Sequence, residues 1–320
     1  GHGTELGSEL LTGARLLHPG PSQPVKLASG CDRRCAFCAI PQFRGAFVSR
    51  PPEDVLAEIG ALVRAGVSEV LLVSENSTSY GKDLGDLRAL EGLLRQAAET
   101  PGLLWLRPCY LQPAELRPTL VEVLATTPGV APYFDLSFQH ASGAVLRRMR
   151  RFGSDETFLE LLGRIRALRP DAGVRSNFIV GFPGETEEDV QILVDFLAAA
   201  ELDAIGLFGY SDEDGTEAVA LPGHLPESEV ADRLAAVRDV ADAVMSDRAE
   251  ARVGEVTQVL VESVDEDGVQ GRAGHQGPED GGTIVSDAPA EVAVGDVLTV
   301  RIVESLGVDV VGTVVADGSS

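Results

Sequence analysis

The chain has 320 residues, 44% of them hydrophobic, and a formal net charge of −24. This length and composition predict a globular protein with one large and one small domain, and they exclude a membrane span, which needs about eighteen uninterrupted apolar residues. The excess of acid disfavours nucleic acid as a partner, because phosphates normally require Lys and Arg, and it favours basic partners. The first residues lack the layout of a secretion signal, so we expect a cytoplasmic protein.

Short apolar, β-branched runs alternate with amphipathic helical stretches from about residue 24 to residue 210. This alternation is typical of a parallel sheet with crossover helices, and six such units predict an α/β domain, a partial (β/α)6 barrel, over residues 24–252. The strands are expected at Val25–Ser29, Val67–Ser74, Leu103–Cys109, Phe134–Phe138, Gly173–Gly181 and Ala204–Tyr210. The helices are expected at Pro52–Ala65, Leu84–Glu99, Pro113–Thr127, Asp155–Leu168, Thr186–Ala200 and Pro226–Arg252.

The composition changes after Gly254 to Val, Gly and acidic residues. The segments Glu255–Val264, Val297–Val303 and Val308–Val315 have the pattern of strands in a small all-β barrel over residues 253–320. This domain has thirteen acidic residues against two arginines, a net charge of −11.

Three of the four cysteines, Cys31, Cys35 and Cys38, lie within eight residues directly after the first expected strand. Thiols this close together do not form a disulfide framework, and in a reducing compartment they usually bind metal. Their spacing allows one loop to ligate three irons of a single 4Fe-4S cluster and leaves the fourth iron open. An open iron on a redox-active cluster is what S-adenosylmethionine (SAM) needs in order to bind and be reductively cleaved to a 5′-deoxyadenosyl radical.

A zinc site of three cysteines and one histidine is the alternative for the same thiols. No histidine lies near this loop, and zinc motifs usually come as two spaced pairs, so the spacing favours the iron-sulfur cluster. The fourth cysteine, Cys109, ends an expected strand, and we expect it to be a buried small hydrophobic residue.

The cysteine spacing and several other strings resemble the radical SAM methylthiotransferases over nearly the whole chain from Pro24 onward, and the last domain resembles their TRAM domain. The matching strings are Lys26–Cys31, Ile40–Gly45, Arg50–Pro51, Glu75–Gly81, Tyr133–Leu136, Gln139–His140, Met149–Arg151 and Phe178–Thr186. The resemblance implies that Cys31, Cys35 and Cys38 hold the cluster.

The same resemblance implies six further contacts with SAM. Phe37 would lie by the adenine, and Glu75 and Asn76 would face the amino group. Gln139, Arg175 and Ser176 would contact the ribose and the carboxylate, the arginine by a charge-assisted pair. Each has a plainer alternative: Asn76 could belong to a simple turn, and Arg175 could be an exposed charge on a strand.

Members of this family carry a further N-terminal domain with three more cysteines and a second cluster, and this chain has no cysteine before Cys31. The resemblance therefore implies a chain that lacks this domain, binds one cluster, and cleaves SAM without completing methylthiolation. Gly1 and His2 indicate a scar of tag removal, and the rest of residues 1–23 is expected to be an interdomain linker.

Two branches of the family compete. One modifies tRNA adenosines, and the RimO-type branch adds a methylthio group to an aspartate β-carbon of small-subunit ribosomal protein twelve. A barrel with a charge of −11 would repel RNA and attract a basic ribosomal protein, so charge favours the RimO type. The string Phe134–His140 also resembles this type, although Ser137 and Phe138 replace its usual Pro-Leu.

Two interpretations of other classes stay open: a non-catalytic scaffold that binds a ribosomal protein, and a radical SAM enzyme for a small molecule. The intact cysteines count against the first, and the TRAM-like domain counts against the second. We expect a monomer with a basic ribosomal protein as its partner, without tRNA or membrane.

Overall fold

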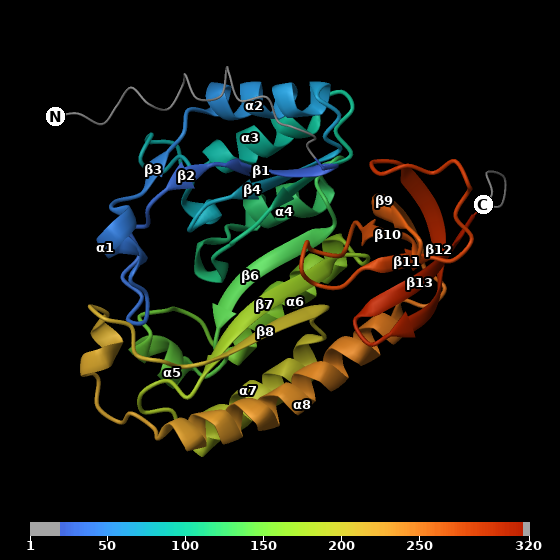
Figure 1. Ribbon diagram of the computed structural model, residues 1–320. Coiled ribbons are helices and arrows are strands. Elements are labelled where there is room, and N and C mark those ends of the chain that lie inside the picture. Colours follow the sequence, from blue (N-terminus) through green and yellow to red (C-terminus); the bar gives the residue numbers. More distant parts are fainter. Residues whose placement is uncertain (1–19, 316–320) are drawn as a thin grey trace.

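The computed structural model describes residues 20–315, so the expected tag scar at Gly1–His2 and most of the expected linker lie outside the described residues. Six parallel strands form two neighbouring three-stranded sheets, and a closed five-stranded barrel follows. Figure 1 shows these two parts side by side, with helices covering the outer face of the sheets. The prediction of an α/β partial barrel followed by a small all-β barrel is confirmed.

The two three-stranded sheets continue into each other and form one curved sheet, called the arc below. Two isolated parallel bridges, Leu106 to Val130 and Leu111 to Leu136, connect them. The order along the arc is therefore β1-β4-β5 and then β6-β7-β8. The bounds are β1 Ser22–Lys26, β4 Glu69–Val73, β5 Trp105–Pro108, β6 Tyr133–Gln139, β7 Gly173–Val180 and β8 Ala204–Gly209.

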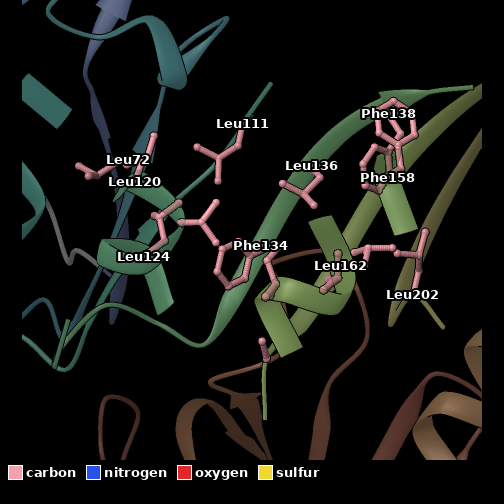
Figure 2. Close-up of a cluster of buried hydrophobic side chains, with 14 of the residues drawn as sticks. Leu72, Leu111, Leu120, Leu124, Phe134, Leu136, Phe138, Phe158, Leu162 and Leu202 are labelled. Atoms are coloured by element: carbon pink, nitrogen blue, oxygen red, sulfur yellow. The ribbon is translucent and has the colours of Figure 1, made fainter. Parts of the chain in front are cut away.

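The helices bury the outer face of this arc, and the alternation along β6 shows why. Phe134, Leu136 and Phe138 are fully buried toward the helices, while the residues between them face the concave side. In Figure 2, Phe138 of β6 meets Phe158 of α6, with ring centroids 4.3 Å apart. The helices are α2 Pro52–Arg64, α3 Ala89–Ala98, α4 Pro118–Thr126, α6 Asp155–Leu168, α7 Glu187–Ala200 and α8 Glu227–Ala251.

Several expected elements begin or end elsewhere than predicted. The first strand breaks at Leu27, and the short β2 (Ala28–Ser29) leaves the sheet to pair antiparallel with β3 (Val48–Ser49). The helix expected from Leu84 begins at Ala89, because turns with glycines at positive φ precede it.

The segment expected to be one helix from Pro113 to Thr127 is two elements. The 3-10 turn η2 (Pro113–Glu115) comes first, and α4 starts at Pro118, whose ring disfavours a helical conformation at the residue before it. The 3-10 turn η1 (Ser77–Ser79) lies where the sequence left a simple turn open. Three short helices were not expected: α1 (Ile40–Arg44), α5 (Gly143–Arg148) and the 3-10 helix η3 (Glu217–Ala220).

The C-terminal barrel has the strand order β10-β11-β13-β12-β9. Its strands are β9 Val256–Asp265, β10 Gly268–Ala273, β11 Thr283–Val285, β12 Val297–Leu306 and β13 Asp309–Val314. Two of them, β10 and β11, were not expected from the sequence. Val259, Val261 and Val300 form the centre of the barrel's own small core.

The barrel covers the amino-terminal ends of the parallel strands. Its arginine Arg272 pairs with Glu69, the first residue of β4, and its Asp280 bonds Tyr133, the first residue of β6. Gly173, the first residue of β7, lies so close that a Cβ there would be 1.9 Å from the His275 carbonyl oxygen. Figure 1 shows the barrel at the opposite end of the arc from α1. No helix within residues 20–315 is long and apolar enough to cross a membrane.

Candidate functional site

The three clustered cysteines lie in the loop between β2 and β3, at the carboxyl end of the arc. All three are half-buried free thiols. Backbone hydrogen bonds hold the loop: Cys31 N–H donates to the Gly45 carbonyl (3.1 Å), and Ala36 N–H donates to the Met149 carbonyl (3.0 Å). Gly30, at φ +80°, lies against the backbone of Ala46, where a Cβ would approach an oxygen to 2.1 Å. Only glycine fits at this point.

The thiols lie close enough to influence one another's charge. Burial raises the pKa of Cys31, and a thiolate at Cys35 or Cys38 would raise it further. Burial also raises the pKa of Cys38, opposed in part by Arg151. The Arg151 guanidinium lies 3.8 Å from the Cys35 sulfur and also donates to the Ser137 carbonyl. Arg151 therefore places a buried positive charge beside the loop that carries the three thiols.

This donor set fits the iron-sulfur cluster that the spacing predicts. Thiolates are the ligands that such clusters prefer, and a buried arginine offsets the negative charge of a thiolate-bound cluster. Across residues 20–315, no group of three or more His, Cys, Asp and Glu side chains is gathered as a metal site. The assignment of the cluster ligands therefore rests on their spacing and on their common loop.

Glu75, which follows β4, faces this loop with a free acceptor. One of its carboxylate oxygens lies 3.9 Å from Arg44 Nε, and the other is buried without a hydrogen-bond partner. A buried carboxylate oxygen without a donor is costly unless a ligand supplies one. A ligand that carries N–H groups would supply the missing donor at this point.

Asn76 is almost fully buried, and its amide is already engaged. Its Nδ2 donates to Ser79 Oγ (2.9 Å) and to Glu115 Oε2 (3.2 Å), while its Oδ1 accepts from Thr78 Oγ1 (2.6 Å). Glu115 in turn pairs with Arg33 of the cysteine loop at 2.8 Å. Asn76 thus organises the turn η1, the alternative that the sequence left open.

Gln139 ends β6 in a left-handed conformation, with φ +71°. Two other non-glycine residues of this kind, Tyr110 after β5 and Arg150 after α5, also lie in segments beyond the carboxyl ends of the strands. The fourth among the described residues is Glu201, at the end of α7. Left-handed conformations of such residues are costly and gather at functional sites. These strained residues therefore indicate that a functional site lies at the carboxyl end of the arc.

The structure separates Arg175 and Ser176 from the other expected contacts. Adjacent residues of a strand face opposite sides, so the two cannot line one cleft. Ser176 is fully buried on the helix side, where its Oγ accepts from the Phe138 N–H (3.1 Å). Arg175 faces the concave side near the amino end of β7 and pairs with Asp280 at 2.8 Å and Asp135 at 3.4 Å. Phe37 lies between the cysteines, half-buried against the main core.

Four residues that the sequence reasoning missed share the concave face with Arg175. Asn177 has a buried Oδ1 without a partner, and Gly206, opposite it on β8, leaves space for its side chain: a Cβ there would be 2.1 Å from that oxygen. Next along the strands, Ile179 lies opposite Phe208, which is 56% exposed. The period-2 alternation from Arg175 could have identified Asn177 and Ile179.

The matched residues His140 and Glu185 form a buried structural pair. His140 Nε2 lies 3.3 Å from Glu185 Oε2, and both side chains are fully buried. His140 Nδ1 accepts from the Ser142 N–H at 2.9 Å, whereas its Nε2 lies near Glu185 without a hydrogen bond to any described residue. Both Glu185 oxygens accept from the Gly181 N–H (3.0 Å), which fixes the turn after β7.

Comparison with known families agrees with this geometry. Residues 25–197 match the model described as "Radical SAM superfamily", and residues 253–315 match the model described as "TRAM domain". The chain therefore belongs to the radical SAM superfamily and carries a C-terminal TRAM domain. Coproporphyrinogen III oxidase (HemN) of Escherichia coli, a radical SAM enzyme, shares the fold with a TM-score of 0.51 at 16% identity, over 72% of this chain and 53% of that one.

The chain is also similar to curated relatives named "Ribosomal protein uS12 methylthiotransferase RimO". The relative from Salinispora tropica is 61% identical over 93% of this chain and 60% of its own length. The relative from Kineococcus radiotolerans is 60% identical over 92% of this chain and 62% of its own length. The chain thus spans about three fifths of the length of these relatives.

Proposed function

We propose that this chain is the SAM-cleaving part of a methylthiotransferase that acts on an aspartate β-carbon of a basic small-subunit ribosomal protein. The observation that carries the proposal is the loop of Cys31, Cys35 and Cys38 at the strained end of a radical SAM arc, in a chain 61% identical to a uS12 methylthiotransferase. The protein would act in the cytoplasm as a monomer.

The three thiols would hold one 4Fe-4S cluster. When bound, this cluster supplies the electron that cleaves SAM and leaves a 5′-deoxyadenosyl radical. Glu75 would accept hydrogen bonds from the SAM ammonium, and Gln139 would contact its ribose. Phe37 would lie beside the adenine. Asn76 would act by holding η1 in place.

Arg175 and Ser176 have no direct contact with SAM in this proposal. Asn177 and Ile179 would contact SAM instead, because they share the concave face and lie nearer the carboxyl end of β7. An amide oxygen without a donor suits a polar edge of the ligand, and an aliphatic side chain suits a flat apolar ring.

The acidic barrel would bind the basic substrate protein. Of its two arginines, Arg272 is buried and Arg301 is exposed. Within residues 253–315, eight acidic side chains are exposed: Asp265, Glu266, Asp267, Glu279, Asp287, Glu291, Asp296 and Glu304. Such a surface attracts a basic protein over long range and repels tRNA. The barrel covers the amino ends of the strands, and α1, which directly follows the cysteine loop, lies at the opposite end of the arc in Figure 1. A substrate held by both the barrel and the cysteine loop must therefore span the domain.

Because the sequence offers one group of clustered cysteines, we propose that it binds one cluster and does not complete methylthiolation by itself. The test is anaerobic reconstitution with iron and sulfide, addition of SAM and dithionite, and measurement of 5′-deoxyadenosine. The expected result is steady production, with about four irons per chain, and loss of production in Cys35→Ala.

The outcomes separate the competing functions. A fully loaded wild-type chain that makes no 5′-deoxyadenosine would support the scaffold and contradict the proposal. Salt-sensitive binding of a basic ribosomal protein is expected, and binding of tRNA in its place would favour the tRNA branch. A second cluster in the iron analysis would contradict the single-cluster assignment.

A further inference from the structure

Two buried ionic clusters join the C-terminal barrel to the arc, and they differ in which parts of the arc they connect to it. The first contains Glu69, which pairs with Arg107 (2.7 Å) and with Arg272 of the barrel. All three side chains are buried at the amino ends of the strands. The Arg107 guanidinium also contacts the barrel, where it donates to the Gly274 carbonyl (3.0 Å). Its hydrogen bonds end at the domain interface, where the Arg107 guanidinium also lies 4.7 Å from the centroid of the Tyr133 ring.

The second cluster begins at Asp280 of the barrel and continues into the concave side of the arc. Asp280 accepts from Tyr133 Oη (2.5 Å) and from Arg175 Nε (2.8 Å). Arg175 Nη1 reaches Asp135 Oδ1 at 3.4 Å. Although burial lowers the pKa of Arg175, Asp280 and Asp135 raise it above its usual range. Arg175 is therefore a fixed cation between the two carboxylates.

Asp135 connects this ion pair to Tyr110. Its other oxygen, Oδ2, accepts from the Tyr110 N–H at 2.8 Å, and its backbone carbonyl accepts from the Leu111 N–H at 2.9 Å. Tyr110 has φ +59° and is 46% exposed. A left-handed tyrosine persists only when its surroundings fix it, and these two bonds do so on one side.

The carbonyl of Tyr110 fixes the other side. It accepts from the Ser77 N–H (3.2 Å), and the nearby Gln112 N–H donates to Thr78 Oγ1 (2.9 Å). Ser77 and Thr78 belong to η1, which begins two residues after Glu75. A continuous set of hydrogen bonds therefore runs from the barrel to the turn that presents Glu75.

We propose that Asp280 is a positioning residue for the SAM cleft: through Arg175 and Asp135 it holds Tyr110 in its left-handed conformation and thereby sets η1. The C-terminal barrel then completes the SAM domain in addition to any role in substrate binding. This inference rests on the proposed function for its ligand, but the hydrogen-bonded path is present without SAM.

The test compares Asp280→Ala and Asp280→Asn with Glu69→Gln, a matched control that weakens the other interdomain cluster. Backbone amide exchange is measured by mass spectrometry on the reconstituted proteins without SAM. The SAM dissociation constant is then measured by calorimetry. Thermal unfolding checks that each variant is folded, and Asp280→Asn, which keeps an oxygen for Arg175, provides a milder variant should Asp280→Ala fail to fold.

The expected result for Asp280→Ala is exchange about tenfold faster in residues 75–80 and 110–112, with SAM bound about tenfold more weakly, a change typical of losing one charged hydrogen bond. Glu69→Gln should leave both quantities unchanged. Unaltered exchange in these two segments would overturn the proposal. Unchanged SAM binding in Asp280→Ala would also overturn it, because the SAM cleft would then not depend on Asp280. Tighter SAM binding would overturn it as well, because the freed Arg175 would then be a direct ligand. Failure of wild type to bind SAM would contradict the proposed function, while the exchange data would still decide this inference.

Discussion

The two ends of the strand arc differ in which buried polar atoms lack a partner. At the amino end, the charges of Glu69 and Arg272 are buried and paired with each other, and the atoms without a partner include a donor, Arg107 Nη2, and the Ser22 hydroxyl. At the carboxyl end, Glu75 and Asn177 each keep a buried acceptor oxygen without a partner, and Tyr110 is strained. Protein interiors normally satisfy buried polar groups, so acceptor oxygens without a donor beside strained backbone suit a ligand that carries N–H or O–H groups. The contrast separates the part of the molecule that binds from the part that stabilises.

The largest expected effect is at the carboxyl end. Replacing Cys38 by Ala removes one thiolate of three, and we expect SAM cleavage to fall by at least about a thousandfold, equivalent to about 4 kcal/mol. Because the loop is held by backbone bonds of Cys31 and Ala36, the unfolding midpoint should change little. The measurement is 5′-deoxyadenosine produced per chain, beside thermal unfolding. Activity that survives in Cys38→Ala would remove this residue from the ligand set.

The amino end should show the opposite behaviour. Burial raises the pKa of Glu69, but Arg107 and Arg272 outweigh it and lower that pKa from 4.5 to about 2. A carboxyl whose pKa is lower in the folded state stabilises the fold above pH 4.5, and this contribution is lost as the pH falls toward 2. By pH 3 the loss amounts to about 2 kcal/mol.

Urea unfolding of wild type and Glu69→Gln at pH 7 and pH 3 measures this contribution. The difference in unfolding free energy between the two proteins should shrink by about 2 kcal/mol at the lower pH. An unchanged difference would show that Glu69 does not carry its charge in this cluster. Comparing two variants at each pH cancels the titration of the other carboxyl groups.

The sequence predicted the strands of the arc well because each is a β-branched run with a helix on one side. It predicted the cysteine ligands from spacing, which depends on local chain geometry alone. The resemblance supplied two neighbouring residues, Arg175 and Ser176, as SAM contacts. Only every second side chain of a pleated strand faces a cleft, so Ser176 was misplaced. It missed β10 and β11, where glycines such as Gly271 weaken the alternation.

The ion pairs between the domains had no signal in the sequence. Asp280 and Arg175 are 105 residues apart, and Glu69 and Arg272 are 203 apart. Pattern and propensity report on neighbours along the chain, so they cannot pair charges across such distances. The interpretation of Arg175 as a ligand for the SAM carboxylate depended on treating it as a free cation, and the fold gives it two carboxylates.

A smaller effect is expected from Gly206→Ala on the concave face. The added Cβ would lie 2.1 Å from Asn177 Oδ1, so the Asn177 side chain must move. If Asn177 contacts SAM, the dissociation constant should rise about tenfold, or about 1.4 kcal/mol. Calorimetric titration of SAM into the reconstituted variant measures this. Unchanged affinity would place Asn177 outside the SAM site.

The smallest effect, and the matched control for that substitution, is Gly163→Ala. Gly163 is an exposed residue within α6, and a Cβ there meets nothing within 4 Å. Alanine loses less conformational freedom than glycine when a helix forms, so this variant should be more stable by about 0.5–1 kcal/mol with SAM affinity unchanged. Neither glycine has a positive φ, so the two substitutions differ in the space around the new methyl group and not in backbone strain. Both variants are measured by urea unfolding and SAM titration. Weaker SAM binding in Gly206→Ala alone would assign the lost affinity to the cleft. A loss of SAM affinity in both variants would show that the assay reports general disturbance of the fold.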